Sequence, residues 1–161
     1  MSLRTDRMDQ VDRSEDMVDT KKGNGNLLAL SIGIVYVWFG SLKFVPDLSP
    51  AEGLAKDTIH ELTFGLIPAD ISILLLAMWE TCVGLMLILN IMRRFAIRFA
   101  LLHILLTFSP LLLFPERVFT NTPFALTLLG QYIAKNFVIL CVLIFLMTTR
   151  SGPCGRKNHT L

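Results

Sequence analysis

Polar side chains that could carry acid–base or ligand chemistry lie within otherwise apolar stretches of this chain. The clearest case is the apolar run 124–147, which contains Gln131, Lys135 and Asn136 near its centre. About 20 apolar residues are enough to cross a bilayer, and a lysine at that depth costs about 3 kcal/mol unless a partner relieves it. We therefore expect other membrane spans to supply polar partners for Lys135.

Two further ionisable residues fall in the middle of apolar runs. Glu80 lies in the second run and His103 in the third. At about 1.5 Å per residue, both lie in the same layer of the membrane as Lys135. Because lipid cannot satisfy these groups, we predict that they face one another inside a bundle and that Glu80 pairs with Lys135. Two interpretations stay open for this pair, a structural ion pair and a ligand or proton site, and His103 could also be a hydrogen-bonded packing residue.

A second polar layer is expected nearer the outer face. Tyr36, Gly40 and Lys43 recur at helical spacing and share one face of the first run. Gln131 lies at a similar depth on the last run. Lys43 and Gln131 could donate hydrogen bonds to a ligand carbonyl, with Tyr36 and Trp38 lining the pocket. The alternative for Lys43 is that its ammonium extends to the outer headgroups.

Composition places these residues in an integral membrane protein. Of the 161 residues, 53% are apolar, and the mean hydropathy of +0.58 is too high for an ordinary soluble domain. We predict an all-α, four-transmembrane-helix bundle over residues 27–149, between a disordered cytoplasmic tail (1–26) and a short basic cytoplasmic tail (150–161). The spans are expected at 27–45, 71–92, 95–114 and 124–147, the last one beginning after a cap at Thr122 and Pro123.

A short amphipathic surface helix is expected between the first two spans. Ser49, Pro50 and Glu52 fit a capping box with proline at the first helical position, and Asp70 is the expected N-cap of the second span. The apolar residues of the short helix share one face: Ala51, Leu54, Ala55, Ile59 and Leu62. We place this helix flat on the membrane surface or over the mouth of the bundle.

The distribution of cations predicts the orientation. Arg93, Arg94 and Arg98 fall on the same side of a four-span topology as the two charged tails. The loops on the opposite side contain Lys56 and Arg117. By the positive-inside rule, both termini should face the cytoplasm.

Several classes of function are disfavoured by what the sequence contains. It has no basic cluster interleaved with aromatic residues, so nucleic acid is not an expected partner. Its three cysteines form no CxxC motif, and Cys82 and Cys141 lie in apolar runs, so we expect neither a disulfide nor thiol redox activity. Glu80 and His103 are too few ligands for a typical metal site, and no flavin, haem or iron–sulfur motif is evident.

Three motifs resemble those of the DoxX/DoxD-like integral membrane proteins, over residues 27–147. They are Gly40-Ser-Leu-Lys43-Phe44, Glu80-x-x-x-Gly84-Leu85 and Gly130-Gln131-Tyr132-Ile133-Ala134-Lys135-Asn136. The resemblance implies a multi-pass four-helix bundle in a bacterial cytoplasmic (inner) membrane. Members of that family include the small subunit of a thiosulfate:quinone oxidoreductase and a subunit associated with a terminal quinol oxidase. The motif positions implied as functional are Gly40, Lys43, Glu80, Gln131, Lys135 and Asn136.

The leading hypothesis is an integral membrane subunit of a quinone-linked redox or oxidative-stress-defence system. Its candidate catalytic or proton-relaying residues are Glu80, His103 and Lys135, and its candidate ligand-binding residues are Tyr36, Gly40, Lys43, Gln131 and Asn136. We expect no intrinsic cofactor, with a quinone as the ligand and electrons supplied by a soluble or membrane-bound redox partner or by the substrate. Whether the chain is itself catalytic, and whether it forms a homo-oligomer, stays open. The alternative hypothesis is a non-enzymatic scaffold or assembly factor whose polar core is purely structural.

Overall fold

The computed structural model describes residues 2–46, 48–49, 51–120 and 125–149. Across these residues the protein is all-α, with seven helices and no β-structure beyond an isolated bridge between Phe119 and Leu126. In chain order the helices are α1 (Ser2–Leu42), α2 (Glu52–Leu62), α3 (Ala69–Ile88), α4 (Arg93–Leu106), α5 (Pro110–Leu113), α6 (Pro115–Val118) and α7 (Leu128–Thr149).

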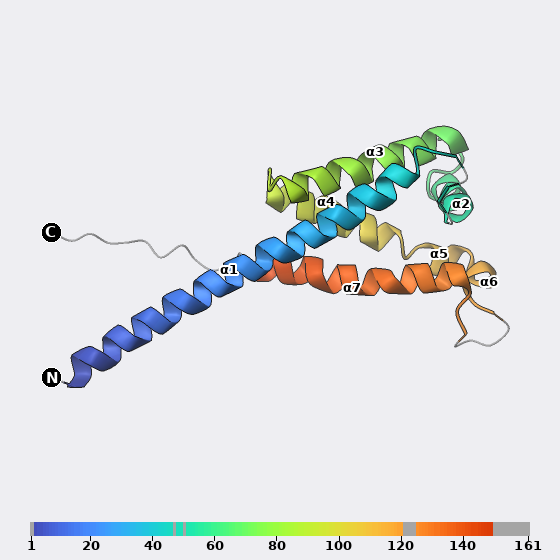
Figure 1. Ribbon diagram of the computed structural model, residues 1–161. Coiled ribbons are helices and arrows are strands. Elements are labelled where there is room, and N and C mark those ends of the chain that lie inside the picture. The colour runs from blue at the N-terminus through green and yellow to red at the C-terminus, as the bar shows by residue number, and fades with distance from the viewer. Residues whose placement is uncertain (1, 47, 50, 121–124, 150–161) are drawn as a thin grey trace.

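Four stretches of the described chain are long and apolar enough to cross a bilayer, which confirms the predicted four-span architecture of a multi-pass membrane protein. They are Gly23–Leu42, Ala69–Ile88, Arg93–Leu113 and Leu128–Thr148. The spans alternate in direction, so the start of α1 and the end of α7 point toward the same end of the bundle (Figure 1). Helix α3 packs against α1 and α4, whereas α7 packs against α4 and α1.

Helices α1 and α3 approach each other at small residues. A Cβ atom on Gly84 would lie 2.7 Å from the backbone nitrogen of Val37 and 2.8 Å from the carbonyl oxygen of Gly33. A Cβ atom on Gly40 would lie 2.9 Å from the backbone nitrogen of Thr81. Small residues of this kind let the backbones of two membrane helices come into direct contact. The glycines therefore explain why α1 and α3 can pack so closely.

The buried apolar residues form two clusters. The larger one joins the spans, and its members include Ile32, Val83, Leu87, Ile97, Ile104, Leu143 and Leu146. The smaller one consists of Leu54, Val118 and Ile133 and lies where α2 and α6 meet α7. Many other large apolar side chains are exposed, as expected for helices whose outer faces contact lipid.

Helix α1 is continuous from Ser2 to Leu42 and so includes residues 2–26. That this segment is a disordered cytoplasmic tail stays a prediction. The backbone of α1 runs straight through the glycine- and asparagine-rich segment 23–26, where we expected a break. The physical reason is a tertiary contact from α4. The buried Arg93 donates hydrogen bonds to the carbonyl oxygen of Gly25 and, at 2.5 Å, to Oδ1 of Asn26. This contact secures the segment as part of a packed helix, against its weak helix propensity.

The helix starts also differ from the predictions. The capping box is wrong, because α2 begins at Glu52 after Ala51 without a side-chain cap bond. Helix α3 begins at Ala69, so Asp70 lies in its first turn instead of capping it. The cap predicted at Thr122 and Pro123 lies outside the described residues.

The last span begins later than predicted. Helix α7 starts at Leu128, and Oγ1 of Thr127 accepts a hydrogen bond of 3.1 Å from the backbone N–H of Gly130. This is the geometry of a helix N-cap. Lys135 therefore lies in the second turn of α7, about 10 Å along the helix axis from its start at 1.5 Å per residue.

We predict that Gly84→Ala destabilises the bundle by about 1–3 kcal/mol, because the added methyl group meets backbone atoms of α1 that cannot move without separating the two helices. The measurement is the free energy of unfolding in mixed detergent micelles. Gly53→Ala is the matched control, since a Cβ atom there meets nothing within 4 Å and α2 should gain about 0.5–1 kcal/mol from the better helix former. Equal effects of the two substitutions would contradict the tight α1–α3 contact.

Candidate functional site

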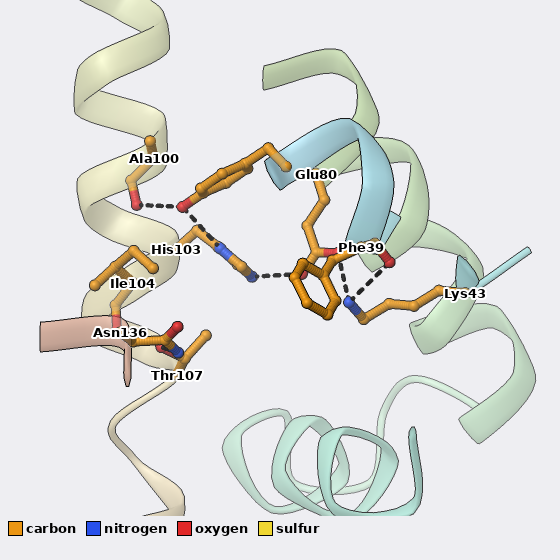
Figure 2. Close-up of polar contacts among 9 residues, drawn as sticks. Phe39, Lys43, Glu80, Ala100, His103, Ile104, Thr107 and Asn136 are labelled. Carbon is orange, nitrogen blue, oxygen red and sulfur yellow. Dashed lines mark hydrogen bonds and ion pairs between the residues drawn. The ribbon is translucent and has the colours of Figure 1, made fainter. Parts of the chain in front are cut away.

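The carboxylate of Glu80 is the centre of a buried polar network that joins three spans (Figure 2). Glu80 lies in the middle of α3 and is only 6% exposed. Its Oε2 atom lies 2.5 Å from Nζ of Lys43, and its Oε1 atom lies 3.1 Å from Nε2 of His103. Lys43 follows the last residue of α1, and His103 comes from α4. One carboxylate is thus shared between a cation from one helix and an imidazole from another.

The network continues from His103 to a tyrosine. Nδ1 of His103 lies 3.2 Å from the hydroxyl oxygen of Tyr36, and the two rings meet edge to face at 5.5 Å. The Tyr36 hydroxyl also donates a hydrogen bond of 3.1 Å to the carbonyl oxygen of Ala100 on α4. Both ring nitrogens of the buried histidine therefore have partners.

The predicted pairing of Glu80 with Lys135 is wrong, because Lys43 occupies that place. The membrane depths predicted for the two lysines were wrong because α1 and α7 begin and end at other residues than expected. Lys43 lies one residue beyond α1, and its side chain turns back so that Nζ lies 3.5 Å from the carbonyl oxygen of Phe39, one turn earlier. Lys135 is only about 10 Å into α7, whereas Glu80 is about 16 Å into α3. The packing order adds to this difference, since α3 contacts α1 closely along its length.

An apolar cleft of about 580 Å³ opens beside this network. Residues from α1, α2, α3, α4 and α7 line it, and Tyr36, Lys43, Glu80 and His103 are all among them. The apolar walls include Val35, Phe39, Leu76, Ile104, Ile133 and Ile139. The predicted apolar face of α2 also lines the cleft through Ala51, Leu54, Ala55, Ile59 and Leu62. This places α2 over the bundle mouth, which is one of the two positions we predicted for it.

The remaining predicted site residues divide between the cleft and its surroundings. Lys135 and Asn136 line the cleft, and Nδ2 of Asn136 donates a hydrogen bond of 3.0 Å to Oγ1 of Thr107. Gln131 is exposed and outside the cleft lining, so the predicted layer of Lys43 and Gln131 does not form. Gly40 contacts α3 instead of a ligand space.

Trp38 does not line the pocket as predicted. Its side chain is 65% exposed on the outer surface of α1 and is not among the residues of the cleft. It lies two residues after Tyr36, and positions two apart on a helix face different directions. Phe39, three residues after Tyr36, contributes to the cleft wall in its place.

The sequence analysis missed the contacts that hold α2 in position. Arg117 of α6 forms an ion pair with Asp57 of α2. Lys56 of α2 lies 2.8 Å from Glu52 in its own helix and 3.7 Å from Asp70 at the start of α3. The signal in the sequence was the presence of Glu52 and Asp57 in α2 together with Lys56 of the same helix and Arg117 of the next outer loop.

The hydrogen-bond pattern can accommodate two protonation states of His103. With one ring proton, Nε2–H donates to Glu80 and the Tyr36 hydroxyl can donate to Nδ1. With two ring protons, Nδ1–H donates to the Tyr36 oxygen and the hydroxyl proton turns to the Ala100 carbonyl. In both states each polar atom in the series Glu80, His103 and Tyr36 keeps a hydrogen-bond partner. The network therefore keeps its hydrogen bonds whether His103 carries one ring proton or two.

A double-mutant cycle tests which lysine partners Glu80. We predict that Lys43→Met and Glu80→Gln each cost about 1–3 kcal/mol of unfolding free energy, because each leaves a buried polar group without its ion-pair partner. The double variant should cost at least about 1 kcal/mol less than the sum of the two.

The control cycle pairs Glu80→Gln with Lys135→Met. These two changes should be additive to within about 0.5 kcal/mol, because the structure gives the two residues no direct contact among those it describes. A larger coupling energy for Lys135 than for Lys43 would contradict the observed pairing.

Comparison of this chain with models of known protein families found no match, and searches of curated proteins and of solved structures found none either.

Proposed function

We propose that this protein is an integral membrane subunit of a quinone-linked redox or oxidative-stress-defence system. In this proposal, a quinone-like ligand binds in the apolar cleft, beside the network of Lys43, Glu80, His103 and Tyr36. The single observation that carries the proposal is that a buried hydrogen-bonded network of ionisable side chains lies next to an apolar cleft of ligand size. The DoxX/DoxD-like motifs in the sequence favour the same class of function.

The size and lining of the cleft fit such a ligand. Its volume of about 580 Å³ falls within the range of about 300–1,000 Å³ that small-molecule sites occupy. Quinone rings are flat and apolar with a carbonyl oxygen on either side, so they need apolar walls and hydrogen-bond donors. Lys43 supplies donors from the α1 side of the cleft, and Lys135 and Asn136 supply them from α7.

The buried network gives the proposed site its chemistry. Reduction of a quinone to a quinol consumes two electrons and two protons. In the proposal, His103 gives one of the two protons to the ligand, and solvent at the mouth of the cleft supplies the other and reprotonates His103. Glu80 stabilises the charged form of His103, and Tyr36 preserves its hydrogen bonds. Lys43 forms an ion pair with Glu80 and orients its carboxylate. The electrons come from a soluble or membrane-bound redox partner or from the reduced substrate.

The proposed setting is a bacterial cytoplasmic membrane with both termini in the cytoplasm. Support comes from Arg94 and Arg98, which are exposed on α4 and follow Arg93, the residue that binds Gly25 and Asn26 of α1. Arg93 is buried against α1, so its role in the packing is separate from any contribution to orientation.

A cleft-filling substitution tests the proposal directly. In nanodiscs, the purified protein should bind a menaquinone or ubiquinone analogue, and Leu76→Trp should weaken binding at least tenfold because Leu76 lines the cleft. The measurement is isothermal titration calorimetry. The control is Leu75→Trp, since the neighbouring Leu75 is 47% exposed and outside the cleft. Absence of binding to the unmodified protein, or equal loss in both variants, would refute the proposal.

A scaffold or assembly factor is the second candidate, favoured by one observation. The N-terminal part of α1 extends well beyond the other helices (Figure 1), so this segment projects from the bundle on the side where a partner protein would bind in this proposal. Deletion of residues 2–20 discriminates between the two candidates. A scaffold should lose its cellular function while the purified protein still folds, whereas a quinone-binding subunit should keep its ligand affinity.

A further inference from the structure

The charged residues that line the cleft do not balance one another. Lys43 and Glu80 neutralise each other at a distance of 2.5 Å. Lys135 is the third charged residue of the lining, and among the described residues no ion pair is recorded for it. Its Nζ atom lies 5.1 Å from the centre of the Tyr132 ring. With His103 neutral, the cleft therefore carries one net positive charge.

Lys135 is exposed in the bundle itself, so in a bilayer its ammonium would meet the apolar walls of the cleft and the lipid, where an unbalanced cation is unfavourable. Leu129, Val138 and Ile139 line the cleft from the same helix as Lys135, and the helix begins about 10 Å away along its axis. The Tyr132 ring offers a weak attraction through its π-face, which compensates for only part of the lost hydration. A negative charge on a bound molecule would supply the missing counterion in a medium where ion pairing is strong.

The other polar groups indicate what kind of anion this is. Donors enter the cleft from two sides, Lys43 from the end of α1 and Asn136 with Lys135 from α7. Asn136 uses one of its two amide protons on Thr107, which leaves the second for a ligand. A ring with hydrogen-bond acceptors on opposite edges can bind both sets of donors at once. A fatty-acyl chain has its acceptors at one end only, so it can bind one set. The apolar walls then surround the body of the ring and its tail.

We infer that the cleft selects a ring ligand that carries an ionised acidic group, and that Lys135 is the specificity-determining counterion for that charge. This inference rests on the proposed function, because it names the class of quinone-like ligand that the same cleft prefers. Hydroxyquinones are members of this class, since their ring hydroxyl is acidic enough to be ionised at neutral pH. Neutral quinones are the less favoured ligands.

A pair of probes that differ by one acidic proton tests the inference. Lapachol is a prenylated hydroxynaphthoquinone whose hydroxyl ionises at neutral pH, and its O-methyl ether has the same ring and tail without that charge. In nanodiscs at neutral pH, the full-length protein should bind lapachol at least about tenfold more tightly than the ether, as one charge-assisted hydrogen bond provides.

Variants of Lys135 locate the source of the preference. Lys135→Met keeps the length and apolar stem of the side chain, so it should bring the affinity for lapachol down to that for the ether, and it should lower the affinity for the ether by a smaller factor because the ether loses only a hydrogen-bond donor. Lys135→Arg should retain the preference. The control Arg98→Met removes an exposed cation of α4 outside the cleft and should change neither affinity.

The outcomes separate this inference from the proposed function. Equal binding of lapachol and its ether would overturn the role of Lys135 and leave quinone binding intact. Binding of neither probe would overturn the proposed function. A preference that survives Lys135→Met would show that another group recognises the charge. Displacement of lapachol by oleate at equal concentration would show that the cleft recognises an acyl anion, which also contradicts the ring ligand.

Discussion

The buried carboxylate of Glu80 is the constraint on which the bundle depends. A carboxylate at the middle of a membrane span is stable only if cations and hydrogen-bond donors replace the water it has lost. Lys43 and His103 provide them from α1 and α4, so one side chain of α3 determines where two other spans must lie. Tyr36 completes the network through a hydrogen bond between its hydroxyl group and Nδ1 of His103.

The close contact of α1 with α3 makes that network geometrically possible. Gly33, Gly40 and Gly84 allow the two backbones to touch, which brings the end of α1 within reach of the middle of α3. Lys43 then needs only to turn back along its own helix to meet Glu80. The resemblance implied that Gly40 and Lys43 belong to one functional motif. In the structure they act in different ways. Gly40 lets α1 come close to α3, and Lys43 pairs with Glu80 across that short distance.

The same arrangement leaves a space on the other side of Glu80. Helix α7 packs on α4 and α1, and the cleft lies between residues of α3 and α7, with α2 across its mouth. Arg117 and Asp70 anchor α2 through Asp57 and Lys56. The contact of α1 with α3 thus holds the Lys43–Glu80 pair, and the cleft beside it provides an apolar volume in which this pair and Lys135 of α7 can act on a ligand.

The amino-acid sequence by itself determined the four spans, the amphipathic helix between the first two spans, and Glu80 and His103 as buried polar residues. Each of these depends on local composition or periodicity, which a linear pattern records. The need for Glu80 and His103 to find polar partners also followed from the sequence, because lipid offers none. Only the tertiary structure decided which partners they found. Helix α7 starts at Leu128 because Thr127 caps it, and this shifts Lys135 away from the depth that a count from Phe124 predicts. Neither this start nor the packing order of the helices is encoded in the spacing of residues along one span. Lys43 pairs with Glu80 because α1 and α3 are in contact, and α1 continues through residues 23–26 because Arg93 binds that segment from a helix more than 60 residues away in sequence.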